Sequence, residues 1–173
     1  MARLSYPDEQ KLAEEPLVQR IVGERGSLLN LYRMLMHSPP LAEGWLSFFT
    51  AIRQKCGLSG KIREMVILRI ASIHGASYEF AAHEPFGLRE GLTPTQIEAL
   101  KTGNLDAFDA KERAILTYCE SITHEIHVPD AVFNSAKEHF SESEMVELTA
   151  TIAAYNLVSR FLEALQVDPE PQN

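Results

Sequence analysis

Apolar and polar positions follow helical periods along almost the whole chain. The densest apolar stretch lies in residues 59–91, and its apolar side chains cover nearly the full circumference of a helix. This pattern is typical of a helix buried on all sides. It predicts a central helix over 61–73 with Ser59 as N-cap, then a second helix that starts near Ala76 after a break at Gly75. We expect the other elements to pack around this helix pair.

Helical periods and capping signals predict further helices on both sides of the pair. They cover residues 9–22 (interrupted at Pro16), 27–37, 41–55, 93–103, 109–126, 129–140 and 141–166. Gly23 and Gly26 are both expected to break the chain. No segment alternates apolar and polar residues between hairpin turns, as a strand would. The predicted fold is therefore all-α, a bundle of about eight helices around a buried central pair.

The length of 173 residues suits one domain over 1–173 with a sizeable core. Residues 1–10 and 167–173 are polar, and we expect them to be disordered tails.

Charge and composition exclude several function classes. The formal net charge of −8 argues against non-specific binding to nucleic acid or to an anionic membrane. No apolar stretch has the length of a membrane span, and the first ten residues have no apolar segment of the secretory type. Cys56 and Cys119 are far apart in the sequence and form no C-x-x-C. The prediction is a cytoplasmic protein with neither nucleic acid nor membrane as partner.

Three ionisable residues stand out in the central pair: Glu64, Glu79 and His83. Glu79 and His83 are at i and i+4, which places their Cβ atoms ~6 Å apart on one helix face. A carboxylate beside an imidazole raises the imidazole pKa and selects its tautomer. Glu64 lies in the apolar helix, where a charge needs a partner. Pro85 is expected to kink or loosen the second helix just past His83.

The sequence allows two interpretations of each of these residues. His83 is either a general acid/base or a core histidine hydrogen-bonded to Glu79. Glu64 takes part in the chemistry or forms a structural ion pair with Arg63 or Arg69. Glu79 faces a ligand or orients His83.

Other candidates carry weaker signals. Arg63, Arg69 and Arg160 are candidates to bind a substrate carboxylate, because guanidinium groups bind carboxylates in a bidentate manner. The alternative for each is a surface or interface charge. His124 and His127 surround Glu125 at a predicted helix end, and we interpret them as a solvated last turn. No metal site and no cofactor are predicted.

The spacing of these residues resembles the core motif of the AhpD-like / carboxymuconolactone decarboxylase superfamily. Its peroxidase branch carries Glu, eleven residues, Cys-x-x-Cys, three residues and His, and here Glu64 and His83 fall on the outer positions. The two cysteine positions are occupied by Ala76 and Glu79. The segment Tyr78 to His83 is instead similar to the Tyr-Glu-x-x-x-His form of the decarboxylase-like branch. Similarity over residues 26–165 also includes the segments Asn30-Leu31-Tyr32, Ser38-Pro39-Pro40, Gly91-Leu92-Thr93 and Tyr155-Asn156, and Arg160.

The resemblance implies an AhpD-like helical bundle and a cofactor-free lyase or isomerase for a small carboxylated or lactone substrate. His83 would be the general acid/base, tuned by Glu79, with Glu64 as a proton relay or an orienting group. Tyr78, Arg63 and Arg160 would bind the substrate. It further implies a homo-oligomer, trimeric or hexameric, for which the apolar helices over 28–35 and 45–52 are candidate surfaces.

Two other functions stay open. An AhpD-like peroxidase or oxidoreductase needs a thiolate and a nearby resolving thiol, and Ala76 and Glu79 occupy both motif positions. A non-catalytic member of the superfamily would bind a ligand in the former active-site pocket.

Overall fold

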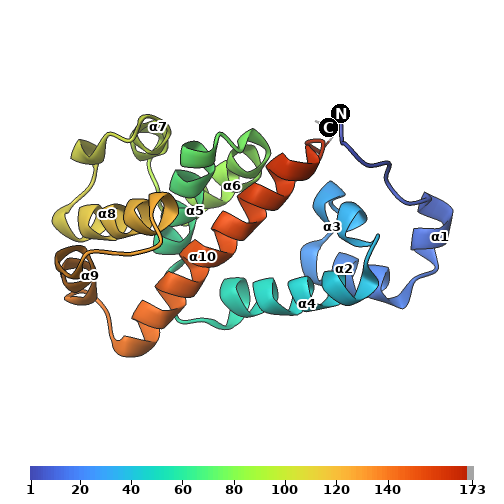
Figure 1. The fold of residues 1–173 in the computed structure, drawn as a ribbon, viewed down its shortest axis with the longest axis horizontal. Coiled ribbons are helices and arrows are strands. Elements are labelled where there is room, and N and C mark those ends of the chain that lie inside the picture. The colour runs from blue at the N-terminus through green and yellow to red at the C-terminus, as the bar shows by residue number, and fades with distance from the viewer. Residues whose placement is uncertain (171–173) are drawn as a thin grey trace. The chain divides into compact units, whose positions relative to one another are not determined.

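The structure, a computed structural model, describes residues 1–170, which form helices and short connections without a β-strand (Figure 1). The described range contains the α-helices α1 (Glu9–Ala13), α2 (Pro16–Arg25), α3 (Asn30–Leu35), α4 (Pro39–Thr50), α5 (Gly60–His74), α6 (Ser77–Arg89), α7 (Pro94–Thr102), α8 (Ala110–His124), α9 (Asp130–Lys137) and α10 (Glu142–Leu165). A π-helical turn η1 (Ala51–Lys55) follows α4, and a 3-10 turn η2 (Leu105–Ala107) follows α7. The all-α prediction is confirmed, with ten α-helices in place of about eight.

The chain divides into two compact units. One contains residues 1–56 with the segment from Leu162 onward, and the other contains residues 57–161. The single domain over 1–173 stays a prediction. No helix in the described range has the length and apolar character needed to cross a membrane.

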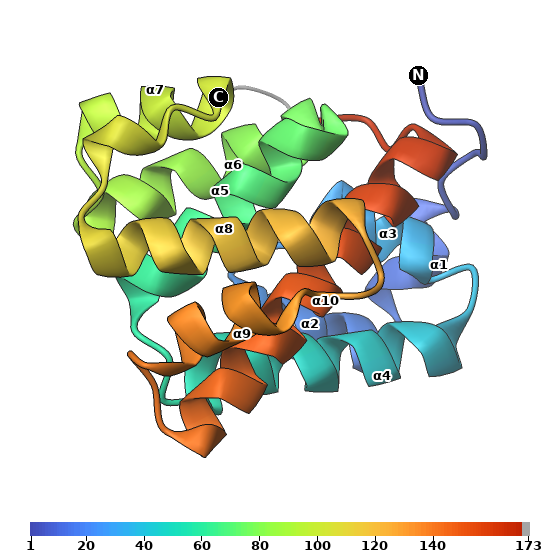
Figure 2. The same cartoon turned by 60° about the vertical axis from the view of Figure 1, so that its left-hand side comes forward.

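In the unit of residues 57–161, α5 is the central helix. It packs against α6, α7 and α8, and α8 runs beside it in a second view (Figure 2). The predicted cap is present, because the Ser59 side chain accepts a hydrogen bond from the Ile62 backbone N–H. Gly75 ends α5 with φ +64°, a left-handed conformation that glycine adopts without strain. This turn sends the chain back so that α6 lies along α5, as the apolar pattern predicts.

Close packing holds α6 against its neighbours. A Cβ on Gly87 would lie 2.9 Å from Leu68 Cδ1, so any larger residue there would require the Leu68 side chain or α6 to shift. Pro85 lies inside α6, and the helix continues through it to Arg89. The proline removes one hydrogen bond but does not end the helix after His83.

Capping boxes begin three of the other helices, as predicted. Thr93 and Asp109 each exchange hydrogen bonds with the residue three positions later, at the starts of α7 and α8. Ser141 does the same with Glu144 at the start of α10. These local signals therefore set the beginnings of three helices.

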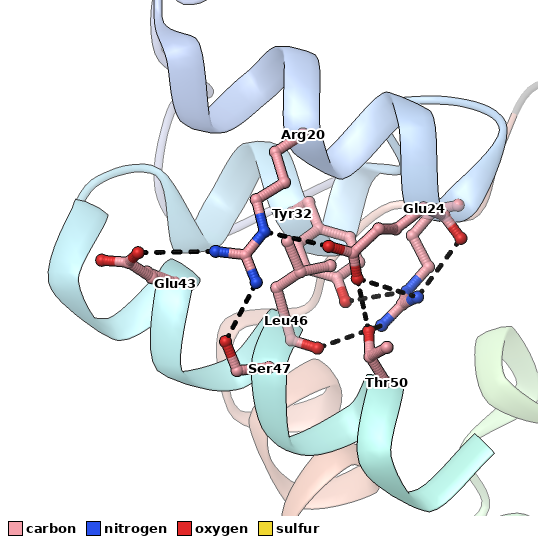
Figure 3. A network of polar contacts seen from close by, with 8 residues as sticks. Arg20, Glu24, Tyr32, Glu43, Leu46, Ser47 and Thr50 are labelled. Carbon is pink, nitrogen blue, oxygen red and sulfur yellow. Dashed lines mark hydrogen bonds and ion pairs between the residues drawn. The ribbon is translucent and has the colours of Figure 1, made fainter. Parts of the chain in front are cut away.

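In the other unit, a half-buried arginine joins three helices. Arg25 of α2 donates to the Tyr32 hydroxyl at 3.1 Å, to the Leu46 carbonyl at 3.2 Å and to Thr50 Oγ1 at 2.7 Å. Thr50 in turn donates to Glu24 at 2.6 Å (Figure 3). Because these partners lie on α2, α3 and α4, the network sets how the three helices pack.

Two predictions for this unit differ from the structure. Gly23 lies inside α2, and only Gly26, with φ +85°, ends that helix. Residues 1–8 and 167–170 are joined by hydrogen bonds instead of forming separate loose tails. Tyr6 accepts a hydrogen bond from the Asp168 backbone N–H at 3.0 Å, and Asn30 Nδ2 donates to the Asp168 carbonyl at 3.1 Å. The last three predicted tail residues, 171–173, lie outside the described part of the chain.

Candidate functional site

The α5–α6 hairpin brings together the three ionisable residues that the sequence singles out. Glu64 lies on the buried face of α5, while Glu79 and His83 lie one turn apart on α6. All three are buried, with exposed fractions of 0% for Glu64 and 4% for Glu79 and His83. We call these three residues the Glu–His–Glu cluster.

Both ring nitrogens of His83 face a carboxylate. Nδ1 lies 2.6 Å from Glu64 Oε2, and Nε2 lies 3.3 Å from Glu79 Oε1. The first distance is that of a short, charge-assisted hydrogen bond, and the second is longer than a typical one. Glu64 therefore fixes the orientation of the imidazole, whereas Nε2 can exchange Glu79 for another partner.

Arg63 holds the second oxygen of Glu64. Its Nε donates to Glu64 Oε1 at 3.1 Å, and its Nη2 lies 4.0 Å from Glu90 Oε1. The predicted structural ion pair of Glu64 is thus present together with its contact to His83. With His83 protonated, Glu64 and Glu79 are balanced by two cations, so the buried group carries no net charge.

Opposing effects set the pKa of His83. Burial alone lowers this pKa, because the imidazolium loses its hydration. The negative charge of Glu79 and the hydrogen bond to Glu64 raise it by more, so the pKa of His83 lies above its ordinary value. In the protonated form of His83, both ring N–H groups face a carboxylate, so a proton on Nε2 lies beside Glu79.

Two aromatic rings enclose the imidazole. The ring of Tyr155 on α10 meets His83 edge-on with 5.3 Å between centroids, and Phe86 on α6 lies 5.9 Å away. Sequence reasoning noted Tyr155 only as part of the family resemblance and did not place it at the site. Phe86 was missed, although its position three residues after His83 puts it on the same helix face. These rings exclude water from the buried side of the imidazole.

Tyr78 and Arg160 lie on other sides of their helices than His83 and Tyr155. Tyr78 precedes His83 by five residues, which turns it about 140° around α6. Arg160 is exposed and follows Tyr155 by five residues, so it lies about 140° from the helix face that meets His83. Their roles in substrate binding stay predictions.

Asn156, next to Tyr155, joins α10 to two other helices. Its Oδ1 lies 2.8 Å from His74 Nε2, and its Nδ2 donates to Thr123 Oγ1 at 3.1 Å. Because an amide oxygen only accepts, His74 carries its proton on Nε2. This network sets the register of α10 against α5 and α8, and with it the position of Tyr155 over His83.

The two cysteines have different surroundings. Cys119 is fully buried, and burial raises the pKa of its thiol to about 12. Cys56 is half-buried and follows η1. The thiol of Cys119 is thus protonated at neutral pH, which is the inert form.

In the part of the chain that the structure describes, no group of three His, Cys, Asp or Glu side chains is placed to hold a metal ion. His124, Glu125 and His127 are exposed at and after the end of α8, as expected for a solvated turn.

Comparison with known proteins shows a family match and a shared fold. Residues 39–121, which include the whole Glu–His–Glu cluster, match the Carboxymuconolactone decarboxylase family. The fold matches an uncharacterized peroxidase-related protein of Ralstonia eutropha JMP134 with an alkylhydroperoxidase AhpD core. That match has a TM-score of 0.84 and 22% identity, over 98% of this chain and 92% of that one. The chain thus contains a segment that matches the Carboxymuconolactone decarboxylase family, and its fold is AhpD-like.

Two other proteins that resemble the chain have different descriptions. YdfG of Bacillus subtilis (strain 168), an uncharacterized protein, is 27% identical over 106 residues, which are 60% of this chain and 72% of that one. The debrominase Bmp8, in complex with 2,3,4-tribromopyrrole, has a TM-score of 0.80 and 19% identity, over 98% of this chain and 94% of that one. Similarity at these identities shows the shared fold.

We predict that His83 titrates above the ordinary imidazole pKa of about 6.5. Because its pKa is raised in the folded chain, its protonation adds stability that is complete below pH about 6.5 and is lost as pH rises through the folded pKa. NMR titration of the His83 Cε1 proton measures this pKa. Glu79→Gln removes the largest raising effect and should lower the midpoint, whereas Glu84→Gln, one residue beyond His83, should leave it in place. A His83 midpoint below 6.5 in the unmodified protein contradicts this account of the cluster.

Proposed function

We propose that the protein is a cofactor-free, decarboxylase-like lyase or isomerase that acts on a small carboxylated or lactone substrate. His83 is the general acid/base. The observation that carries the proposal is the buried imidazole between two carboxylates, 2.6 Å from Glu64 and 3.3 Å from Glu79. Catalytic acids are found where burial and nearby charges shift a pKa in this way.

The proposed reaction transfers a proton to carbon after loss of CO₂. The bond between the carboxylate and its neighbouring carbon breaks, and the electron pair moves through the adjacent double bond to the substrate's carbonyl oxygen, which gives an enolate. The Nε2–H of His83 then protonates the carbon, and the enolate becomes a neutral carbonyl product. A proton from water restores the imidazolium. No external electron acceptor is needed, because the electron pair of the broken bond stays on the substrate and forms the new C–H bond.

The two carboxylates have different roles in this proposal. Glu64 holds Nδ1 through the short hydrogen bond and is itself held by Arg63, so the imidazole keeps its orientation. Glu79 makes the longer contact with Nε2, and its carboxylate must move away from Nε2 when the substrate carbon approaches. Glu79 thus keeps His83 protonated until the substrate takes its place.

Family likeness supports the size and kind of substrate. The family matched over 39–121 is named for a carboxylated muconolactone, and Bmp8 is in complex with a small ring compound. Both are consistent with a small cyclic ligand near His83.

The alternative function is a thiol-dependent peroxidase, and the two cysteines argue against it. Neither cysteine occupies the motif positions, and the pKa of Cys119 is raised to about 12, the opposite of an activated thiol. The cluster supports proton transfer better than disulfide exchange.

The test is turnover by the unmodified protein in D₂O with a panel of carboxylated lactones and small β-keto acids. We expect CO₂ release in step with product, and one deuterium on the carbon that lost its carboxyl group. Ligand binding without turnover of any panel acid would overturn the lyase proposal and favour a non-catalytic binding protein. Peroxide consumption with a dithiol reductant that is lost in a Cys56→Ser, Cys119→Ser double variant would overturn it in favour of a peroxidase.

A further inference from the structure

A row of three side chains on α6 leads from the Glu–His–Glu cluster to solvent. His83, Phe86 and Arg89 follow one another at intervals of three residues, and each step turns about 60° around the helix. His83 is buried, Phe86 is half-buried and Arg89 is exposed. We call these residues the α6 row, and all of them belong to the unit of residues 57–161. The row therefore connects the buried imidazole with the protein surface.

The Phe86 ring contacts both ends of the row. Its centroid is 5.9 Å from that of the His83 ring, and Arg89 Cζ is 4.7 Å from the same Phe86 centroid. Both distances are typical of direct contact with an aromatic ring. A guanidinium group that stacks on a ring uses its flat face, so its N–H edge stays available to an anion. The ring thus holds a cation close to the imidazole without occupying its hydrogen-bond donors.

Arg89 has no carboxylate partner within the described part of the chain. The two arginines of α5 differ in this respect. Arg63 Nε donates to Glu64 at 3.1 Å, and Arg69 Nε donates to Glu120 at 2.6 Å. Their positive charges are therefore balanced inside the protein, whereas the charge of Arg89 is available to an external anion.

The cluster by itself does not attract an anionic substrate. Glu64 and Glu79 are balanced by Arg63 and the protonated His83, so the buried group carries no net charge. The two carboxylates also oppose a further negative charge beside them. An acid that binds next to His83 is therefore held best when one of its carboxylates pairs with a cation outside the cluster. Arg89 is such a cation, at the other end of the α6 row.

We propose that Arg89 binds a carboxylate that the substrate keeps throughout the reaction. The preferred substrate is then an acid with two carboxylates, of which one is lost as CO₂ beside His83 and the other stays on the guanidinium group. Bidentate pairing with Arg89 fixes the position of the substrate along the Phe86 ring. This inference rests on the proposed function for the place of the reacting carbon. Arg89 determines specificity and takes no part in the proton transfer.

Isothermal titration calorimetry with glutarate, an unreactive diacid, tests the binding step. We expect Arg89→Met to weaken glutarate binding about 10- to 100-fold, the usual effect of losing a charge-assisted pair, and Arg89→Lys to keep part of the affinity. The matched control is Lys101→Met. Lys101 is an exposed cation of α7 whose Nζ lies 5.0 Å from the ring centroid of Phe80 on α6, and its replacement should leave the affinity unchanged.

Turnover of two related β-keto acids tests which carboxylate Arg89 binds. 3-Oxoglutarate and its monomethyl ester share the carboxylate that is lost, and the ester lacks the one that is kept. Relative to the uncatalysed rate, we expect a lower KM for the diacid than for the ester. Arg89→Met should raise the diacid KM to that of the ester with kcat nearly unchanged, because the bound group does not change in the reaction.

The outcomes separate this inference from the lyase proposal. Glutarate binding that depends on Arg89, without CO₂ release from any acid tested, would support the carboxylate site and overturn the lyase proposal alone. No glutarate binding, an affinity that Arg89→Met does not change, or an equal loss in Lys101→Met would each overturn the role of Arg89. Equal KM values for diacid and ester in the unmodified protein would also overturn it.

Discussion

Replacing His83 by Gln is expected to lower turnover of the proposed substrate by about 10²- to 10⁴-fold, the range that a positioned acid or base contributes. Gln has no ionisable group and cannot deliver a proton to carbon, although it keeps hydrogen-bonding capacity between Glu64 and Glu79. The measurement is steady-state CO₂ release at saturating substrate. The matched control is His127→Gln, which changes an exposed histidine outside the cluster and should keep full turnover.

His83→Gln leaves two buried carboxylates near each other, so loss of folding would also lower turnover. A second variant separates these two causes. Glu79→Gln keeps His83 and removes the charge that most raises its pKa. The basic limb of the pH–rate profile, where the acid form of His83 is lost, should therefore shift to lower pH. Full turnover by His83→Gln, with an unchanged pH profile in Glu79→Gln, would remove His83 from the mechanism.

Glu64→Gln is expected to destabilise the fold by about 3–5 kcal/mol, the cost of breaking a buried ion pair from one side. Glu64 accepts hydrogen bonds on both oxygens, from Arg63 Nε and from His83 Nδ1. The Gln amide offers one acceptor, and its NH₂ group would face a donor. One buried cation then loses its partner, which is a large loss against the roughly 5–15 kcal/mol that stabilises a typical domain.

Urea unfolding followed by circular dichroism measures this effect. The control is Glu98→Gln, at a side chain that is 68% exposed and lies 3.5 Å from Lys101. Exposed pairs contribute little, so the control should change the unfolding free energy by no more than about 0.5 kcal/mol. Equal unfolding midpoints for the two variants would show that the Glu64 contacts do not stabilise the fold.

Several features of the fold are readable from the sequence because they depend on neighbouring residues alone. The apolar circumference of 61–73 identified the buried helix α5, and the structure extends it by one residue at each end. The Ser59 cap, the Gly75 break and the capping boxes at Thr93 and Asp109 are local hydrogen-bonding or backbone signals, and all are present.

Where local signals compete, sequence prediction did less well. Gly23 remains in a helix although glycine lowers helix propensity. Pro85 lies inside α6, and the kink or loosening that it predicts just past His83 stays a prediction.

Within the candidate site, the sequence determined the pairing of Glu79 with His83, since residues at i and i+4 meet on any helix. Only the tertiary structure decided that Glu64, nineteen residues before His83, holds Nδ1, and that Tyr155 covers the ring. It also decided that Arg160 faces away from His83 and that Cys119 is fully buried. These relations depend on the Gly75 turn and on how α6 and α10 pack against α5. Such long-range contacts depend on how the whole core packs, so no short stretch of sequence predicts them.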